Sequence, residues 1–346
     1  MKIKPLNDEY LIEDVVRLKK DKKAYLVGGC VRDWFLGKKC YDIDITFSKY
    51  PLDIAKKISV KYGFDITEFK KFLTIKLKGT DKIIDFATLR KETYSEPAKL
   101  PDVTPASSID DDLIRRDFTT NAIAIDLNKN LYNVIDPFNG IDDIKNGVIR
   151  VLHDRSFIDD PTRIFRAARF ASRFGWKIEK HTLALIKKHQ RYVKFLSTDR
   201  IRNEMIKILS EEKCFNALSM LNDFDEIKKL LNFKFDKKID ELKTLKERLI
   251  FISAFNRTTE FIDNFNFPRD IKTEVKRSVI PIIERMSPQK PIDENAKRVI
   301  RMIYPKIGDK ALKPIDFLKI SKRVKKENLS AAIIRERKKP FLREKI

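Results

Sequence analysis

The chain has 346 residues, of which 42% are hydrophobic and 36% are charged, and its 74 lysines and arginines outnumber 51 aspartates and glutamates to give a net charge of +23. This apolar content excludes a disordered chain, and the length predicts more than one domain. The positive charge favours a polyanionic partner, most simply a nucleic acid, although a lysine-rich solvated surface would have the same composition.

The first half of the chain alternates strand-like and helix-like segments. Short apolar or alternating segments predict strands at 24–27, 41–47, 72–78, 82–88 and 121–127, with the third and fourth forming a hairpin. Helical spacing is predicted over 30–36, ended by Gly37, and from Pro51 to Gly63.

Residues 91–112 are polar, hold three prolines and lack periodicity, so they predict a long loop. From Pro161 onward helical spacing dominates, which predicts an α+β architecture with a mixed head and a helical remainder. Residues 320–346 carry ten basic and three acidic residues, a tail suited either to phosphate contacts or to simple solvation.

Cysteine usage and hydropathy bound the location of the protein. Cys30, Cys40 and Cys214 form no CxxC pair, and with three histidines a structural zinc site is not expected. No stretch resembles a signal peptide and no apolar run approaches the ~18 residues of a membrane span. We expect a cytoplasmic protein with reduced thiols, no membrane association and no stable protein partner.

The strand YDIDITF carries Asp42 and Asp44, separated by one apolar residue. Residues i and i+2 of a strand face the same side, roughly 6.5–7 Å apart. Two such carboxylates suit Mg²⁺, which binds a few carboxylates together with substrate phosphates. An edge strand that merely alternates polar and apolar residues would show the same pattern.

Gly28 and Gly29 stand between a predicted strand and a predicted helix, in a chain with only nine glycines. Backbone N–H groups at such a turn can hold phosphate oxygens, and the missing Cβ permits a close approach. Arg32 can add a charge-assisted contact. Together with the two aspartates, these residues indicate a metal-bound triphosphate.

Two further segments carry charged and polar residues that could contact a nucleotide. In RRDFTTNAIAID, Arg116 can clamp phosphate while Asp117 and Asn121 can contact a ribose, although both also suit a cap or turn. In DDPTRIFRAARFASRFG, Pro161 fits the first helical position, with Asp160 as N-cap. The arginines of that helix share one face, where they repel unless an anion is held, with solvated surface as the alternative: Arg163, Arg166, Arg169 and Arg173.

The segments LVGGCVRDWFLG…DIDI, RRDFTTNAIAID, DPFNGIDDIKNGVIRVL, DDPTRIFRAARFASRFG and STDRIRNEMIKIL occur in this order. They make residues 24–212 resemble the class II tRNA nucleotidyltransferases, or CCA-adding enzymes, and the related bacterial poly(A) polymerases. The resemblance implies a polymerase-β-like nucleotidyltransferase head with a small mixed sheet at 1–153. It also implies a helical neck at 154–215, and a helical body and tail that bind tRNA at 216–346.

The resemblance assigns roles only to matching positions. It implies metal ligation by Asp42 and Asp44, with Asp85 as a third catalytic carboxylate. It implies nucleotide contacts by Gly28, Gly29, Arg32, Arg116, Asp117, Asn121, Asp160, Arg163, Arg166 and Arg169. The chain departs from the family at Asp159, where a glutamate is more usual, and the shorter side chain would change the geometry around the neighbouring arginine.

The implied reaction is Mg²⁺-dependent, two-metal transfer of nucleotides from CTP and ATP to the 3′ end of tRNA. A carboxylate at Asp160 would accept from the exocyclic amine of cytosine or adenine, and Arg163 would donate to the adjacent ring nitrogen. Uracil and guanine reverse both positions, which costs about 1–3 kcal/mol for each unsatisfied buried group.

Several functions remain compatible with these motifs. Family members that add only two cytidines lack a loop between the first two motifs, and residues 91–112 match that loop, which favours a CCA-adding or A-adding enzyme over a CC-adding one. Poly(A) polymerase shares the head motifs. A basic RNA-binding protein without catalysis is the alternative from a different class.

Overall fold

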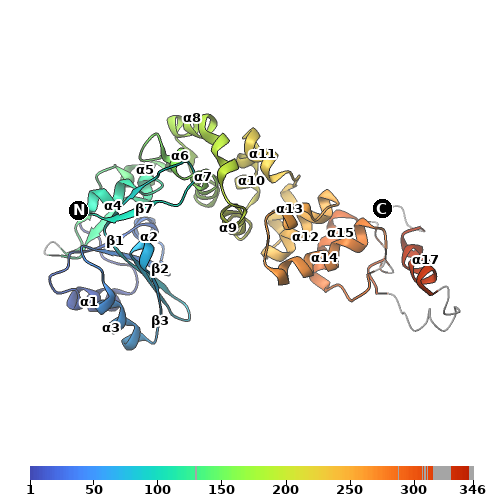
Figure 1. Ribbon diagram of the computed structural model, residues 1–346, viewed down its shortest axis with the longest axis horizontal. Helices are drawn as coiled ribbons and strands as arrows, with labels where there is room; N and C mark the ends of the chain where they lie inside the picture. Colours follow the sequence, from blue (N-terminus) through green and yellow to red (C-terminus); the bar gives the residue numbers. More distant parts are fainter. Residues whose placement is uncertain are drawn as a thin grey trace. The chain divides into compact units, whose positions relative to one another are not determined.

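The computed structural model describes residues 1–128, 131–286, 288–305, 307, 309, 311–314 and 329–342. The chain divides into two compact units, Met1–Phe195 and Leu196–Ile346. The first unit contains a mixed sheet with helices and the second is helical (Figure 1). The predicted fold class, α+β with a small mixed sheet followed by helices, is confirmed. The finer division into head, neck, and body and tail stays a prediction.

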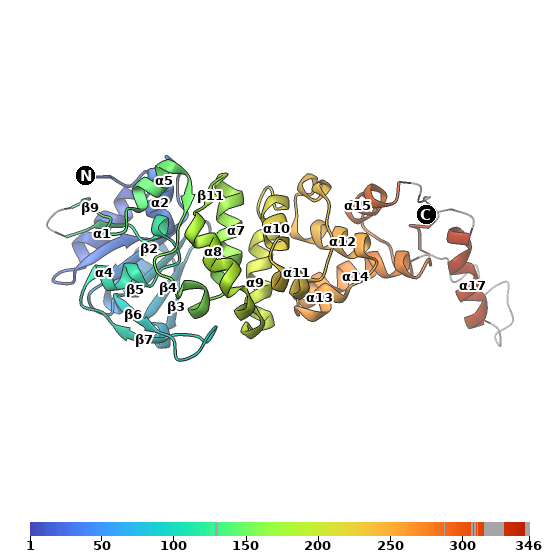
Figure 2. The ribbon, with the colours of Figure 1, turned by 90° about the horizontal axis from the view of Figure 1, so that it is seen from above.

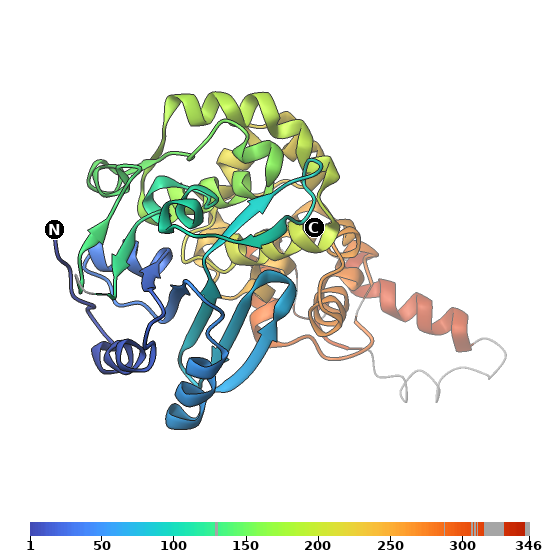
Figure 3. The same cartoon turned by 60° about the vertical axis from the view of Figure 1, so that its left-hand side comes forward.

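The first unit is built on a seven-stranded sheet with the order β3-β4-β5-β2-β1-β8-β9. Its strands are β1 (Ala24–Val27), β2 (Asp42–Phe47), β3 (Asp65–Phe69), β4 (Thr74–Lys78), β5 (Ile83–Thr88), β8 (Ala124–Asp126) and β9 (Val134–Ile135). Neighbours pair antiparallel except β2 and β5, which are parallel. Figure 3 shows strands of this sheet, in blue, running next to one another. The β4–β5 hairpin and the strands expected from the alternation are present, although β8 covers only 124–126 of the predicted 121–127 and Asn121 lies in a 3₁₀ turn.

One face of this sheet is apolar and covered by helices. Ile43 and Ile45 on β2 are buried there, and Phe47 meets Phe86 of β5 edge to face, with ring centroids 5.2 Å apart. The covering helices are α1 (Glu9–Leu18), α2 (Gly29–Phe35) and α3 (Leu52–Tyr62). Because side chains alternate along a strand, the polar residues of β2 and β5 face the opposite side. The core therefore fixes which way the acids point.

Residues 91–112 do not form the long loop that their composition predicted. Strands β6 (Arg90–Thr93) and β7 (Asp102–Pro105) pair antiparallel, and α4 (Ile109–Ile114) follows with its N-cap at Ser108. The loop prediction was wrong because a strand pair is held by backbone hydrogen bonds, which leave no apolar periodicity when both strands are polar. The Ser108 side chain accepts from the Asp111 amide at 3.2 Å, which is a local signal for the helix start.

The rest of the first unit is mainly helical. Its elements are η1 (Lys70–Phe72), η2 (Thr119–Asn121), α5 (Gly140–Asn146), β10 (Val148–Ile149), α6 (Ser156–Asp159), α7 (Thr162–Phe174), β11 (Lys177–Ile178), α8 (Lys180–His189) and η3 (Gln190–Phe195). Helix α7, β11 and α8 follow one another in green in Figure 2. Helix α7 starts one residue later than predicted, with Pro161 at its N-cap, and its C-cap is Gly175 with φ 68°.

The second unit consists of helices. They are α9 (Thr198–Leu209), α10 (Phe215–Asn222), α11 (Asp225–Leu231), η4 (Lys237–Glu241), α12 (Leu245–Asn256), α13 (Glu260–Asn264), α14 (Arg269–Ile283), α15 (Glu294–Ile303) and α17 (Leu329–Leu342). Helix α12 contacts α9, α13, α14 and α15. Of the predicted basic tail, 320–328 and 343–346 lie outside the described residues. No helix in the described part of the chain combines the length and the apolar character needed to cross a bilayer.

Candidate active site

The paired aspartates lie on the polar face of β2. Asp42 is exposed and Asp44 is half-buried, while the intervening Ile43 is 1% exposed in the core. Across the parallel pair, Asp44 is the register partner of Asp85 on β5. Lys76 of β4 donates to Asp85 Oδ2 at 3.1 Å. Three acids on two adjacent strands therefore share one region of the sheet.

The electrostatics of this region suit a divalent cation. Burial raises the pKa of Asp44 to about 6, and the charges of Asp85 and Asp42 add to this, against the opposing charge of Arg116. Asp85 Oδ1 is buried without a hydrogen-bond partner. Negative charge that is buried and incompletely satisfied is what a bound cation relieves.

The carboxylates do not form a complete protein cage for a metal ion. Within the described ranges, no group of three or more histidine, cysteine, aspartate or glutamate side chains is placed to hold one. Mg²⁺ does not need such a cage, because it is usually bound by one or two carboxylates, water and substrate phosphates. Asp42 and Asp44 could supply these one or two carboxylates.

Gly28 brings the glycine turn against the acids. It has φ 79° and ψ −143°, a conformation essentially restricted to glycine. A Cβ on this residue would lie 2.8 Å from Asp44 Oδ2 and 3.0 Å from Arg116 Nη1. Gly29 begins α2 immediately afterwards. The turn predicted to bind phosphate thus touches one predicted metal ligand and one predicted phosphate clamp.

A cavity of about 190 Å³ opens beside these residues. Its lining residues are Val27, Asp44, Ile45, Thr46, Thr74, Asp85, Ala87, Arg90, Arg115 and Arg116. The Thr46 side chain is 1% exposed and its hydroxyl has no hydrogen-bond partner. The cavity wall therefore carries buried polar groups without hydrogen-bond partners.

Asp112 was not singled out from the sequence, yet it holds the arginine pair of this cavity. It is fully buried and accepts from Arg115 Nη2 at 2.8 Å and from Arg116 Nη2 at 2.9 Å. Burial raises its pKa, but the charges of Arg115 and Arg116 outweigh burial and hold the pKa below its usual value. The only signal in the sequence was an acidic run one helical turn before two arginines.

A hydrogen-bonded chain connects α2 with α7. Arg32 Nη1 donates to Asn121 Oδ1 at 2.7 Å, and Asn121 Nδ2 donates to Asp117 Oδ1 at 2.9 Å. Arg166 Nε donates to Asp117 Oδ2 at 2.8 Å. Burial raises the pKa of Asp117, but the charge of Arg166 and the two hydrogen bonds outweigh it and hold the pKa well below its usual range. Four predicted nucleotide-binding residues thus form one network.

The N-terminal end of α7 holds two further predicted residues, Asp160 and Arg163, while Arg169 lies buried further along the helix. Asp160 Oδ1 accepts from the Thr162 amide at 3.0 Å, so this carboxylate caps the helix although Pro161 occupies the N-cap position. Arg163 is 4% exposed and donates to Ser156 Oγ and to the Arg115 carbonyl, both at 2.7 Å. Asp159 pairs with Arg155 at 3.1 Å. Arg163 thereby connects α7 to the residue preceding Arg116.

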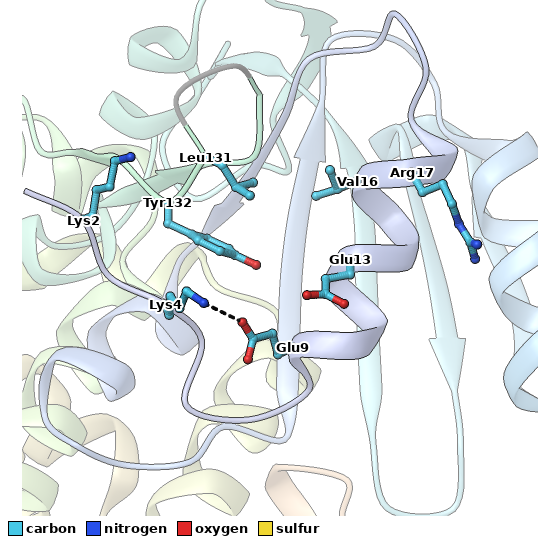
Figure 4. A pocket seen from close by; sticks show the side chains of 8 residues that line it. All are labelled: Lys2, Lys4, Glu9, Glu13, Val16, Arg17, Leu131 and Tyr132. Carbon is cyan, nitrogen blue, oxygen red and sulfur yellow. Dashed lines mark hydrogen bonds and ion pairs between the residues drawn. The ribbon is translucent and has the colours of Figure 1, made fainter.

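A second cavity lies elsewhere in the first unit, beside the N-terminal segment (Figure 4). It measures about 530 Å³ and is lined by Lys2, Lys4, Glu9, Glu13, Val16, Arg17, Leu131 and Tyr132. Lys4 Nζ lies 3.2 Å from Glu9 Oε1 in its lining. None of the residues singled out from the sequence lines it, so its greater size does not make it the candidate site.

Comparison with protein families matches two parts of the chain. Residues 24–150 match the model described as "Poly A polymerase head domain". Residues 175–233 match the model described as "Probable RNA and SrmB- binding site of polymerase A".

Curated relatives match over part of their length. An A-adding tRNA nucleotidyltransferase of Aquifex aeolicus is 39% identical over 221 residues, which are 63% of this chain and 27% of that protein. Another, of Halalkalibacterium halodurans, is 36% identical over 61% of this chain and 51% of that protein. A CCA-adding enzyme of Lactobacillus helveticus is 35% identical over 54% of this chain and 46% of that protein. The chain spans about half or less of the length of these relatives.

Solved structures match over most of the chain. A CCA-adding enzyme in an apo form superposes with a TM-score of 0.68 at 30% identity, covering 94% of this chain and 90% of the other. A tRNA nucleotidyltransferase complexed with a primer tRNA and an incoming ATP analogue superposes with a TM-score of 0.66 at 27% identity, covering 83% and 94%.

Proposed function

The chain belongs to the class II tRNA nucleotidyltransferases and their relatives the bacterial poly(A) polymerases, and we propose that it adds CCA to the 3′ end of tRNA from CTP and ATP without a nucleic acid template. One observation carries this proposal. Gly28 is packed against both Asp44 Oδ2 and Arg116 Nη1, so a phosphate-binding turn, a metal-binding carboxylate and a phosphate clamp meet at one point. This is the arrangement that nucleotidyl transfer from a metal-bound triphosphate needs.

Asp42 and Asp44 would hold Mg²⁺ on the polar face of β2. The raised pKa of Asp44 and the unsatisfied Asp85 Oδ1 support a cation at this position. A bound Mg²⁺ would lower the pKa of the attacking 3′-hydroxyl and stabilise the charge of the departing pyrophosphate. Use of two such ions is part of the proposal.

The protein's own groups bind and orient the nucleotide. The backbone of Gly28 and Gly29, with Arg32 and Arg116, would contact the triphosphate. The Arg32 side chain is oriented by the hydrogen bond of 2.7 Å that its Nη1 donates to Asn121 Oδ1. In the complex, Asp117 and Asn121 would contact the ribose, and Arg166 and Arg169 would contribute further nucleotide contacts. The side chains start from a preassembled network, so little ordering is required on binding.

Base choice would depend on the first turn of α7. Asp160 would accept from the exocyclic amine of cytosine or adenine, and Arg163 would donate to the neighbouring ring nitrogen. Arg163 is 4% exposed and held by two hydrogen bonds of 2.7 Å, which fixes its guanidinium. A fixed donor next to a carboxylate would reject uracil and guanine, because each would leave buried groups unsatisfied.

The A-adding activity is the second candidate. The relatives from A. aeolicus and H. halodurans, at 39% and 36% identity, are both named A-adding enzymes. The match to a poly(A) polymerase head model keeps that activity as a further outcome. A CC-adding enzyme is disfavoured because the β6–β7 hairpin and α4 are present where such enzymes lack a segment.

The test is incorporation into tRNA that lacks its 3′ end. The protein is incubated with Mg²⁺ and each nucleoside triphosphate, singly and together, and the products are sequenced. We expect CTP alone to add two cytidines and the mixture to stop at CCA. Asp42→Ala should abolish incorporation while tRNA is still retained in a filter-binding assay.

The other outcomes identify the alternatives. A single adenosine added only to tRNA ending in CC would indicate the A-adding enzyme, and long adenosine tails would indicate a poly(A) polymerase. No incorporation by the wild type, with tRNA binding intact, would leave a non-catalytic RNA-binding protein. Wild-type turnover in Asp42→Ala would refute the metal assignment.

A further inference from the structure

Four aromatic rings form a continuous ladder beside the nucleotide-binding network. Phe118 and Phe170 meet edge to face with centroids 6.0 Å apart, Phe170 and Phe174 stack at 6.1 Å, and Phe174 and Trp176 stack at 4.6 Å. We call these four residues the aromatic ladder. Phe170 lies on α7 and is 5% exposed, so its ring is largely shielded from water.

Four cations from two separate segments lie over this ladder. The Arg169 guanidinium is 4.3 Å from the Phe170 centroid and that of Arg166 is 5.4 Å from it. Arg32, from α2, lies 5.0 Å from Phe170 and 4.8 Å from Phe174. Lys38, just after α2, lies 5.3 Å from Phe174. Three of these cations therefore converge on Phe170.

This convergence has an electrostatic cost that two aspartates and the rings together offset. Like charges repel, and the repulsion grows where side chains are buried, as for Arg32 at 4% and Arg169 at 7% exposure. Asp33 pairs with Arg32 at 2.7 Å and Asp117 pairs with Arg166. The negative face of an aromatic ring attracts a guanidinium without neutralising it. A ring can therefore hold arginines together while leaving their charge available to an anion.

We propose that Phe170 is a positioning residue whose ring holds Arg32, Arg166 and Arg169 as one preassembled cationic cluster for the triphosphate of the incoming nucleotide. The inference rests on the proposed function, because it takes the anion to be a nucleoside triphosphate. Preassembly matters because each long side chain ordered before binding reduces the entropy lost on binding. Phe170 itself need not touch the nucleotide.

The first experiment compares Phe170→Leu with Phe165→Leu. Phe165 lies on the same helix, is fully buried and contacts none of the four cations through its ring in any described interaction, so it controls for loss of a buried aromatic side chain. Binding of ATP and of inorganic tripolyphosphate is measured by calorimetry without tRNA. We expect Phe170→Leu to weaken both ligands about 10-fold, equivalent to about 1.4 kcal/mol, and Phe165→Leu to leave both within about 2-fold.

A graded series separates ring electrostatics from packing. Phenylalanine at position 170 is replaced by its mono-, di- and trifluorinated analogues, which keep the shape of the ring but weaken its negative face. We expect the logarithm of the dissociation constant for ATP to rise in proportion to fluorination, with an unchanged midpoint of urea unfolding. A flat series, or equal losses in Phe170→Leu and Phe165→Leu, would overturn the proposal.

A measurement without nucleotide distinguishes this inference from the proposed function. Rings shift the resonances of nearby protons, so the Nε–H signals of Arg32, Arg166 and Arg169 should be displaced upfield in the wild type and return toward ordinary values in Phe170→Leu. If the signals are displaced but ATP does not bind, the proposed function is refuted, and so is a nucleoside triphosphate as the anion bound by the cluster. The contact between the Phe170 ring and the arginines would still be established. Signals that are the same in both proteins would refute the positioning role even if CCA addition is observed.

Discussion

Asp44 and Asp85 occupy matched positions on the parallel strands β2 and β5, and both side chains line the same cavity. The charge of Asp85 adds to burial in raising the pKa of Asp44. The carboxylates therefore repel one another on the polar face of β2, while Ile43 and Ile45 are buried in the core on the opposite face. We therefore expect the stability of the protein to depend on pH and on divalent ions.

Metal-free protein should become more stable as the pH falls from 7 to 5. The folded-state pKa of Asp44 is about 6 and its ordinary value is 3.8, so the folded state binds this proton more readily. The penalty for ionised Asp44 is fully present above pH 6 and is relieved as the pH falls through 6 toward 4. Urea unfolding in the presence of a chelator measures this change.

Asp44→Asn provides the control for that pH dependence. It should raise the free energy of unfolding at pH 7 by about 1–2 kcal/mol, remove the rise between pH 7 and 5, and abolish incorporation. Added Mg²⁺ should stabilise the wild type at pH 7 and leave Asp44→Asn unchanged. Equal stabilisation of both proteins by Mg²⁺ would argue against the cation at this carboxylate.

The sequence predicted the parts of this site that depend on local patterns. Alternation over 41–47 was enough to place Asp42 and Asp44 on one face, because strand periodicity is a local property. The register that sets Asp85 beside Asp44 joins strands about 40 residues apart, and only the family resemblance indicated it. The β6–β7 hairpin was missed because its polar strands carry no apolar period.

The network residues show the same division between local and long-range information. Arg166 was correctly placed on a helix, yet its pairing with Asp117 joins residues that are 49 positions apart. The fully buried Asp112 was read as part of an irregular polar stretch, because nothing local shows that an acidic residue will be enclosed by two arginines. The sequence identified chemical types, and tertiary contacts decided their partners.

Gly28→Ala should damage the site more than another glycine substitution in a positive φ conformation. Its Cβ would lie 2.8 Å from Asp44 Oδ2, whereas a Cβ on Gly37, at φ 70°, would meet nothing within 4 Å. Both variants should lose about 1 kcal/mol or more of stability from backbone strain. Only Gly28→Ala should reduce kcat/KM, by at least about 100-fold, because it displaces Asp44 or Arg116. Equal activity of the two variants would contradict the close contact.

Asp160→Ala should weaken the discrimination between bases and should also lower the free energy of unfolding. Its carboxylate accepts from the Thr162 amide at 3.0 Å, so losing this cap should cost about 1 kcal/mol. If the same group reads the exocyclic amine, discrimination of CTP over UTP should fall by about 10–100-fold. Single-nucleotide incorporation with each triphosphate measures the ratio of kcat/KM values.

A matched variant at another helix N-cap distinguishes the effect of losing the cap from the effect of losing the base contact. Ser197→Ala removes the side chain that accepts from the Arg200 amide at the start of α9. It should cost a similar amount of stability and leave the CTP to UTP ratio unchanged. A ratio that falls equally in both variants would assign the effect of Asp160→Ala to helix capping and not to base recognition.

Arg248→Met should destabilise the helical unit and spare nucleotide binding. Arg248 is 1% exposed and donates to the carbonyls of Leu209 and Glu212 at 2.8 Å and of Leu242 at 3.0 Å, with a further contact to the Glu211 carbonyl. Methionine fills similar space but leaves these carbonyls without their donor, at a cost of about 3–5 kcal/mol.

Arg298→Met is the control, because the Arg298 side chain is 54% exposed and its 2.7 Å ion pair with the buried Glu247 should contribute less than about 1 kcal/mol. Urea unfolding should show the loss only in Arg248→Met, while calorimetry at a temperature below the transition should find wild-type affinity for ATP in both variants, since these acceptors all lie in the second unit. Loss of ATP binding in folded Arg248→Met would show that the nucleotide site depends on this buried arginine.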